Sequence, residues 1–580
     1  MSEVATLYGI RSIRASCISA FLVGGTSILI LRWLKYQRLQ SKIRQKKMKE
    51  DDVIDKCLKQ LHDKEQDAAI ILEKDAKEII LALQRGELDL QSVLDAFLLK
   101  ACAVTKKYNC VTSVMSSAEK NLKTLEQANA SEMPLFGLPV SLKESFKTQG
   151  MDSTIGLSQY IGKPELEDAV LVKVLRHCGA VPFVKTNLPQ LMLSFSSCNP
   201  IYGETSNPHK LGFTPGGSSA GEGSLIGAGG SLLGFGTDIA GSIRQPAHMC
   251  GICGFKPTMN RLSKQGLQGS LPGQTLISAT LGPMARDVET LVLAMKTLLC
   301  PTMFKLDPSV PPMLFNTEVY TTKRKLCIGF YTDDGYNKPI PAVQRAVKKA
   351  KQALELAGHK LIPFQVPKID EAMRIFTAAV YGDGGKMTLN RLKGEVEEPR
   401  LKSLYRKWRM PSVFRWIITF YLSLKSPRIA KDFLLHGGES CTVDRLWKLE
   451  CEAAKYKKDF FDLWESKEVE LDGIICPPFP VVAGPYKHFE NMTALMSYTA
   501  LYNLVNCPAG VLPVTKVTQA DIDQLHDFSG HYGDAWDANV KDACRQSVGM
   551  PVGVQCVAKP WQDEMCLKIM REIELGLGNI

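Results

Sequence analysis

Apolar and small residues run without a charge from Ala15 to Leu31, near the start of the chain. At seventeen residues, this run reaches the short end of a membrane-spanning helix. A cleaved signal peptide is the competing interpretation, but no small-residue cleavage site separates the run from the basic stretch Arg32 to Lys49. The excess of positive charge after the run places that side in the cytoplasm. We therefore expect a single-pass anchor within residues 1–50, with an amphipathic or cleaved segment as the alternative.

Beyond residue 50, the hydrophobic periodicity alternates between helix and strand. Apolar residues near helical spacing predict a charged helix from Asp51 to Arg85 and a second helix after Ser92. The clearest succession is a helix at Pro341–Leu356 followed by a strand at Lys360–Val366. Further predicted elements are strands at 137–142, 471–475 and 550–557 and a helix at 561–574. This alternation favours an α/β fold, which we expect to form one large domain over residues 51–580.

Residues 401–431 differ from the rest, because basic and aromatic residues are interleaved there without an acidic residue. Pro411 divides the stretch into two short helices. Such helices are typical of a membrane interface, where apolar burial and attraction to anionic headgroups add. A hairpin packed in the core, with arginines reaching outward, is one alternative, and nucleic-acid binding is another. The basic residues are Lys402, Arg406, Lys407, Arg409, Arg415, Lys425, Arg428 and Lys431.

Charge is unevenly distributed along the 580 residues, whose formal net charge is +11. Residues 1–50 hold ten Lys or Arg against two Glu, so the remaining 530 residues carry only +3. A body this close to neutral argues against nucleic acid as a partner of the whole protein. The 45% apolar content suffices for a large core. Length alone suggests three or four domains, but the alternating elements fit a single large domain better.

The 17 cysteines follow no regular spacing, which is typical of reduced thiols in a cytosol-facing enzyme and not of a disulfide framework. Cys250 and Cys253 form the one close pair, and they lack a second pair or a histidine cluster at ligand spacing. We therefore expect no metal and no cofactor. The formal glycosylation sites at Asn129 and Asn491 are chance matches if the body faces the cytosol.

Two glycine turns present serines 24 residues apart, at Ser218 and Ser242. The Gly-Ser-Ser-Ala-Gly spacing at 217–221 formally permits a nucleophile elbow at Ser219. An elbow follows a strand directly, however, and residues 207–215 contain two prolines and a glycine. The other base that activates serine is a desolvated lysine, and Lys143 follows a short apolar run.

Lys143, the Gly-Gly-Ser-Ser-Ala-Gly turn at 216–221 and Gly-Thr-Asp-Ile-Ala-Gly-Ser-Ile-Arg at 236–244 together resemble the amidase signature family. The resemblance covers about residues 90–570 and implies a large twisted mixed β-sheet surrounded by helices. It also implies Ser242 as nucleophile, Ser218 as the bridge that relays a proton, and Lys143 as base and later acid. The implied oxyanion hole consists of the backbone N–H groups of Ile239, Ala240, Gly241 and Ser242.

One position departs from the family pattern, which usually has Gly-Gly-Ser where this chain has Ala240-Gly241-Ser242. If the first position needs a positive φ, alanine strains the turn by roughly 1 kcal/mol. If it does not, the change is silent.

Within the family, the resemblance is to members that hydrolyse fatty acid amides. It implies a membrane-bound enzyme of an endoplasmic-reticulum-like membrane, homodimeric, with long-chain N-acylethanolamines and primary fatty amides as substrates. Residues 401–434 would form a membrane-facing cap. The residues implied to contact substrate are Met192, Phe195, Thr493 and Met496, and more loosely Tyr381, Phe433 and Trp536.

Two other functions remain open from the sequence. The first is an α/β-hydrolase esterase that uses Ser219 with His248 or another histidine. The second is a non-catalytic, membrane-anchored interaction protein, or an amidotransferase-like subunit that needs partners. The presence of Lys143, Ser218 and Ser242 together argues against the interaction protein, and the N-terminal apolar run argues against the subunit.

Overall fold

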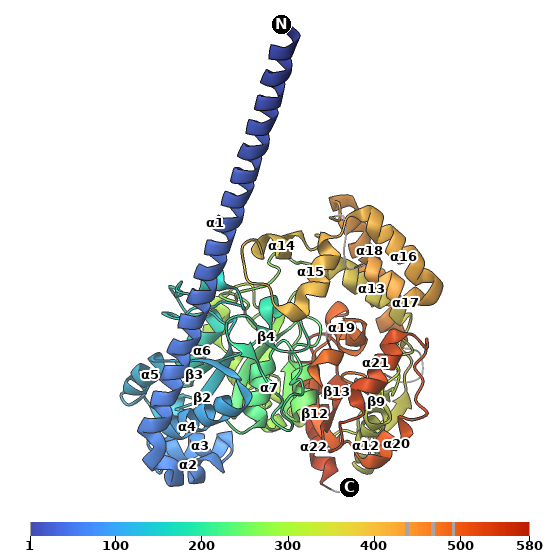
Figure 1. The fold of residues 1–580 in the computed structure, drawn as a ribbon. Helices are drawn as coiled ribbons and strands as arrows, with labels where there is room; N and C mark the ends of the chain where they lie inside the picture. The colour runs from blue at the N-terminus through green and yellow to red at the C-terminus, as the bar shows by residue number, and fades with distance from the viewer. Residues whose placement is uncertain (1, 436–439, 466–469, 490–492, 579–580) are drawn as a thin grey trace.

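The chain begins with one long helix that extends away from a helix-covered body (Figure 1). A computed structural model describes residues 2–435, 440–465, 470–489 and 493–578, without the side chains of 2–29, 32, 435, 493 and 494. Helix α1 spans Ser2–Leu61 and includes the predicted anchor at 15–31, whose side chains up to residue 29 lie outside the described part. Among the helices of the described residues, none combines the length and apolar character needed to cross a membrane.

The C-terminal part of α1 packs on the body, where Ile43 and Ile54 are buried. The predicted helix from Asp51 to Arg85 is wrong as a single element. Here α1 ends at Leu61, and a 3-10 turn leads to α2 (Glu65–Leu72) and α3 (Ala76–Gln84). The break has a local cause, because the Asp75 side chain accepts the backbone N–H of Glu78 and starts a new helix.

A mixed sheet forms the centre of the body, in the order β1-β3-β2-β6-β8-β7-β12-β13-β11-β9-β10. Two parallel groups, β3-β2-β6 and β11-β9-β10, flank an antiparallel centre. The antiparallel pairing of β7 with β12 joins residues 254–256 to residues 509–511. The strands are β1 (Val111–Val114), β2 (Pro139–Lys143), β3 (Val181–Thr186), β6 (Leu233–Asp238), β7 (Cys253–Lys256), β8 (Thr280–Ala285), β9 (Cys327–Phe330), β10 (Lys360–Pro363), β11 (Gly473–Cys476), β12 (Ala509–Lys516) and β13 (Pro551–Val557). A separate hairpin pairs β4 (Cys198–Asn199) with β5 (Gly203–Glu204).

Helices surround the sheet, and the strands β2, β6, β7, β8, β11 and β13 are buried along their whole length. This confirms the expected α/β fold with a large mixed sheet. The predicted helix at Pro341–Leu356 is confirmed with the same bounds, while the strand after it ends at Pro363. The other helices that matter here are α4 (Leu90–Tyr108), α7 (Ala220–Gly227), α8 (Arg244–Cys250), α12 (Pro341–Leu356), α19 (Ser497–Leu504), α20 (Gln519–Gln524), α21 (Ala535–Cys544) and α22 (Asp563–Leu577).

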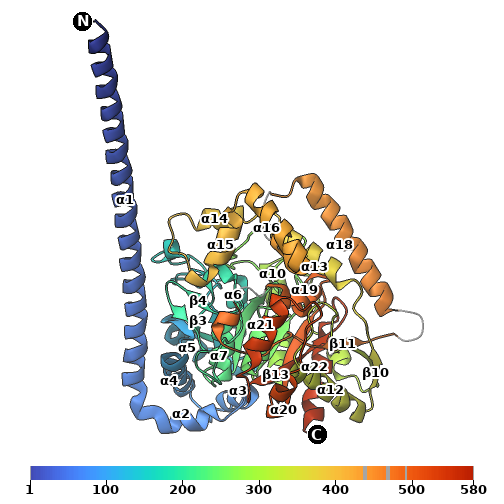
Figure 2. The same cartoon turned by 45° about the vertical axis from the view of Figure 1, so that its right-hand side comes forward.

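The stretch predicted as two helices forms three, here named the cap: α15 (Lys402–Arg409), α16 (Ser412–Lys425) and α17 (Pro427–Leu435). Pro411 makes the first break, and Pro427 makes a second one that the prediction missed. The cap lies at the end of the body from which α1 projects (Figures 1 and 2).

The basic residues of the cap do not all face outward. Arg415 and Arg428 are buried, although the membrane-interface interpretation of this stretch relies on basic residues that reach anionic headgroups. The aromatic face of α16, in contrast, is open, with Trp416 69% and Leu424 70% exposed. Val413, Phe414, Ile417, Phe420 and Tyr421 are exposed on the same helix.

Candidate active site

Lys143 is the last residue of β2, directly opposite Thr186 of β3. Its ammonium group is fully buried and donates hydrogen bonds to Ser218 Oγ and Thr237 Oγ1, both at 2.8 Å. Burial lowers the pKa of Lys143 from 10.5 to about 7, against the opposing influence of Asp238 and Glu222. A substantial fraction of this amine is therefore neutral near pH 7 and able to accept a proton.

The two serine turns lie against one another. Ser218 precedes α7, and the backbone N–H of Ser219 donates to the carbonyl of Ser242 at 3.1 Å. The Gly217–Ser218 peptide bond is cis. Ser218 and Ser242 line the same cavity. Among the described residues, no hydrogen bond joins their two hydroxyl groups, so the relay of a proton between Ser218 and Ser242 is a proposal.

Ser219 does not have the surroundings of an elbow nucleophile. No strand precedes it, and its Oγ accepts the Thr237 N–H at 3.3 Å. His248 is buried elsewhere, where its Nδ1 accepts from Gly553 N and its Nε2 bonds to Val481 O. Burial lowers the pKa of His248 to about 4. The pairing of Ser219 with His248 is therefore contradicted by the positions of both side chains.

An ion pair holds the turn that carries Ser242. The Asp238 carboxylate accepts the backbone N–H groups of Gly241 at 2.8 Å and Ile243 at 3.1 Å. Arg244 Nη2 and Nε also donate to Asp238, at 2.8 and 3.0 Å. Although burial alone raises the pKa of Asp238, the Arg244 guanidinium holds it well below its usual range. The turn is thus built around a permanent carboxylate.

Arg244 also joins this turn to the last third of the chain. Its Nη1 donates to Thr499 O at 3.0 Å and to Gln555 Oε1 at 2.8 Å. Its Nη2 donates to Asn503 Oδ1 at 2.5 Å. Thr499 and Asn503 belong to α19, and Gln555 belongs to β13. The turn that carries Ser242 therefore depends on segments more than 250 residues away in sequence.

The departure from the family pattern at Ala240 is silent. Ala240 is not among the described residues with a positive φ, whereas Gly241 has a φ of +117°. A Cβ on Gly241 would lie 2.6 Å from Thr499 Oγ1, which itself donates to Ala240 O. Glycine is thus required at 241 and not at 240.

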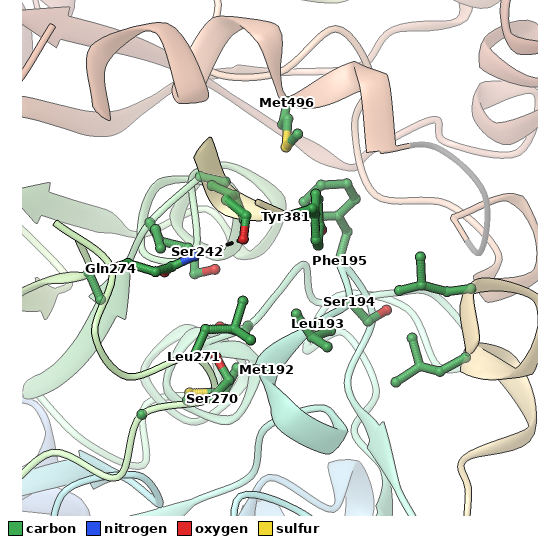
Figure 3. Close-up of a pocket in the computed structure, with 18 of the residues that line it drawn as sticks. Met192, Leu193, Ser194, Phe195, Ser242, Ser270, Leu271, Gln274, Tyr381 and Met496 are labelled. Atoms are coloured by element: carbon green, nitrogen blue, oxygen red, sulfur yellow. Dashed lines mark hydrogen bonds between the residues drawn. The ribbon is translucent and has the colours of Figure 1, made fainter. Parts of the chain in front are cut away.

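A cavity of about 810 Å³ opens in front of Ser242. Figure 3 shows Phe195, Tyr381 and Met496 around the same space as Ser242. Of the residues implied to contact substrate, those that line the cavity are Met192, Phe195, Met496, Tyr381, Phe433 and Trp536. Thr493 belongs to a 3-10 helix, but its side chain lies outside the described residues.

A polar segment at 264–279, which the sequence analysis did not single out, lines another part of the cavity. Lys264 donates to Ser278 Oγ at 2.6 Å, and Gln274 donates to Val380 O at 2.9 Å, the dashed line in Figure 3.

In the described part of the chain, no three His, Cys, Asp or Glu side chains gather in an arrangement that could hold a metal ion.

The family model described as Amidase matches residues 92–567. The chain belongs to the amidase family. It is 42% identical to fatty-acid amide hydrolase 1 of Sus scrofa over 555 residues, which is 94% of each chain. It is 39% identical to fatty acid amide hydrolase 1 of Caenorhabditis elegans, over 85% of this chain and 86% of that one. A solved structure of a fatty acid amide hydrolase matches with a TM-score of 0.77 at 25% identity, over 94% of this chain and 95% of that one.

The amidase therefore cleaves amides, and it resembles the fatty acid amide hydrolases along nearly its whole length. This membership argues against both the esterase with an α/β-hydrolase elbow and the non-catalytic protein.

One buried carboxyl near Lys143 was not assigned a role from the sequence, although it lies inside a motif. Glu222 accepts hydrogen bonds from Ser141 Oγ at 2.6 Å and from Thr186 Oγ1 at 2.8 Å. Ser141 points to the same face of β2 as Lys143, so Glu222 lies on the same side of the strand as the lysine side chain. Burial raises the pKa of Glu222 to about 7, even though both hydroxyls and Lys143 favour its charged form. An acidic residue in a glycine-rich apolar stretch was the available signal.

Proposed function

We propose that this amidase hydrolyses fatty acid amides, chiefly long-chain N-acylethanolamines and primary fatty amides, to a fatty acid and an amine at a membrane surface. The observation that carries the proposal is a buried lysine with a pKa lowered to about 7, bonded to a serine that shares an apolar-walled cavity with a second serine. The cavity volume of about 810 Å³ is within the usual range of ligand sites. The names of the relatives from Sus scrofa and Caenorhabditis elegans support the substrate class.

In the proposed mechanism, neutral Lys143 takes the proton of Ser218 while Ser218 takes the proton of Ser242. The Ser242 oxygen then attacks the amide carbonyl and forms a tetrahedral intermediate. Protonated Lys143 returns a proton through Ser218 to the leaving nitrogen, because an amine anion is a very poor leaving group. The C–N bond breaks, the amine departs, and water hydrolyses the acyl ester of Ser242 by the same relay.

The oxyanion of that intermediate needs backbone donors, each worth roughly 3 to 4 kcal/mol in comparable sites. Gly241 N–H already donates to Asp238, so its part in the proposal is to shape the turn. Ile239, Ala240 and Ser242 are partly exposed to the cavity. Their three N–H groups have no acceptor among the described residues, and we propose them as the donors.

Membrane attachment is a second part of the proposal. The uncharged run at 15–31 and the basic residues after it support an anchor with the catalytic domain on the cytoplasmic side. The open aromatic face of α16, at the end of the body from which α1 projects, supports a cap that rests on lipid (Figure 2). We further propose a homodimer in an endoplasmic-reticulum-like membrane, on the resemblance alone.

Covalent labelling tests the chemistry directly. A fluorophosphonate probe on detergent-solubilised protein should modify Ser242, and Ser242→Ala should abolish both labelling and release of ethanolamine from oleoylethanolamide. Labelling at Ser219 would refute the assignment of the nucleophile. Lys143→Ala should reduce amide hydrolysis more than hydrolysis of the matched ester, because only the amide needs a protonated leaving group. Equal losses on the two substrates would refute the acid role of Lys143.

A further inference from the structure

Arg428 of α17 is buried at the junction of three cavity walls, with 4% of its surface exposed. Its guanidinium Nε and Nη2 donate to the two oxygens of Asp534, at 3.0 and 2.7 Å. Nη2 also donates to Asp537 at 3.0 Å. Two carboxylates at these distances make it one of the most heavily bonded side chains of the cap. A planar fork that engages a carboxylate through two donors fixes orientation as well as distance.

Aromatic rings enclose the same guanidinium. Its central carbon lies 4.3 Å from the ring centroid of Tyr532, 5.1 Å from that of Trp536 and 5.6 Å from that of Tyr336. A cation against ring faces adds attraction that strengthens when water is excluded. Arg428 therefore restrains Trp536 directly, through its ring.

The partners of Arg428 belong to segments that supply cavity walls. Asp534 caps α21 by accepting the N–H groups of Trp536 and Asp537, and Trp536 lines the cavity. On α17, the residue after Arg428 and Phe433 one turn further on also line the cavity. Arg428 thus connects the wall on the cap to the wall on α21.

A third wall is reached through the loop before α12. Arg428 Nη1 donates to Tyr336 O at 2.7 Å and to Asn337 Oδ1 at 3.1 Å. The Asn337 side chain in turn donates to Ser497 Oγ at 2.9 Å. Ser497 follows Met496, which lines the cavity. One side chain therefore links the α17, α21 and 496 walls.

We propose that Arg428 is a positioning residue that holds these three walls at a fixed separation and thereby sets the preference of the amidase for long acyl chains. This inference rests on the proposed hydrolysis of fatty amides. A long chain that fills the cavity must contact the walls, whereas a short amide bound at Ser242 occupies only part of it. Loosening the connection therefore costs contacts with a long chain and leaves the chemistry at Ser242 intact.

The test compares two substrates with the same leaving group, the oleoyl and hexanoyl amides of one aminocoumarin. Arg428→Lys keeps the charge and loses the fork, and active sites are counted with a fluorophosphonate so that only folded enzyme is compared. We expect kcat/KM to fall about tenfold for the oleoyl amide, chiefly through KM, and less than twofold for the hexanoyl amide. Asp537→Asn, which removes one partner and leaves the Asp534 cap in place, should shift the ratio in the same direction.

Arg345→Lys is the control, because it makes the same replacement at another arginine that binds both oxygens of an aspartate. Arg345 of α12 binds both oxygens of Asp521 in α20, at 2.9 and 2.7 Å, and neither residue lines the cavity. Its loss should leave the oleoyl-to-hexanoyl ratio unchanged. If the oleoyl-to-hexanoyl ratio of kcat/KM is unchanged in Arg428→Lys, whether both values fall together or neither falls, the inference is overturned.

Hydrogen exchange separates this inference from the proposed function, because it needs no substrate. Amides of residues 428–434 and 534–537 should exchange at least fivefold faster in Arg428→Lys than in the wild type, and Arg345→Lys should not change them. If the wild type does not hydrolyse the oleoyl amide but exchange does increase, the proposed function fails and the structural role of Arg428 stands. Unchanged exchange overturns that role.

Discussion

Replacing Lys143 with methionine should abolish amide hydrolysis and at the same time make the protein more stable at neutral pH. The lysine amine has a pKa of about 7 in the folded protein against 10.5 for an ordinary lysine. Between these values, the unfolded chain binds more protons than the folded one, so the stability of the wild type falls as pH falls. The penalty starts below pH 10.5 and reaches its full size below pH 7.

The size of the effect follows from the two pKa values. A difference of about 3.5 pH units costs about 5 kcal/mol when Lys143 is protonated, about 4 kcal/mol at pH 7 and about 2 kcal/mol at pH 9. Methionine removes this cost but loses the hydrogen bonds to Ser218 and Thr237, about 1 kcal/mol each. We therefore expect Lys143→Met to match the wild type near pH 9 and to exceed it by about 2 kcal/mol at pH 7.

Thermal unfolding in detergent at a fixed scan rate measures the difference. For a chain of this length, 2 kcal/mol corresponds to a rise in Tm of about 2 °C. Lys143→Arg is the contrasting variant, because arginine stays charged when buried and should be both inactive and less stable than the wild type. If the Tm gap between Lys143→Met and the wild type does not widen as pH falls from 9 to 7, Lys143 is not a neutral amine, and the proposed base loses its support.

Three further changes are expected to have distinct results. Gly241→Ala should lower kcat about 100-fold, because alanine is strained at the positive φ of residue 241 and its Cβ would approach Thr499 too closely. Ala240→Gly should change kcat less than twofold. Equal effects of the two substitutions would contradict this description of the turn. Glu222→Gln removes a charge that raises the pKa of Lys143, so the acid limb of the pH profile of kcat/KM should move to lower pH, and a shift to higher pH would contradict this. Trp416→Glu should weaken binding to anionic vesicles at least fivefold without changing activity in detergent. Unchanged vesicle binding would show that α16 does not contact lipid.

The sequence predicted the parts of the site that are contained in short motifs. Glycine turns and a lysine after an apolar run marked Lys143, Ser218 and Ser242 as candidates at short range, and the resemblance to the amidase signature family implied their roles. The α/β fold was predicted for a similar reason, since helix and strand periodicity alternates along the chain. Elements with local signals, such as Pro341 at the start of α12, agree with the structure to the residue.

The remaining features depend on contacts between distant segments. Nothing near Thr499 or Gln555 in the sequence indicates that Arg244 binds them. The inward orientation of Arg428 depends on Asp534, more than 100 residues away, which no pattern within the cap itself indicates. The break at Asp75 did have a local signal, a capping box with Glu78, which the apolar periodicity concealed.

The connection from Arg244 to Gln555 has a consequence for biosynthesis. All three proposed catalytic side chains are synthesised by residue 242, but Thr499, Asn503 and Gln555, which bind Arg244, and β12, which pairs with β7, come after residue 498. Synthesis of the roughly 310 residues between Ser242 and Gln555 takes roughly 15 to 60 s. Nascent and prematurely terminated chains therefore carry Ser242, the proposed nucleophile, without the contacts that shape its turn, and we expect hydrolytic activity only when translation is almost complete.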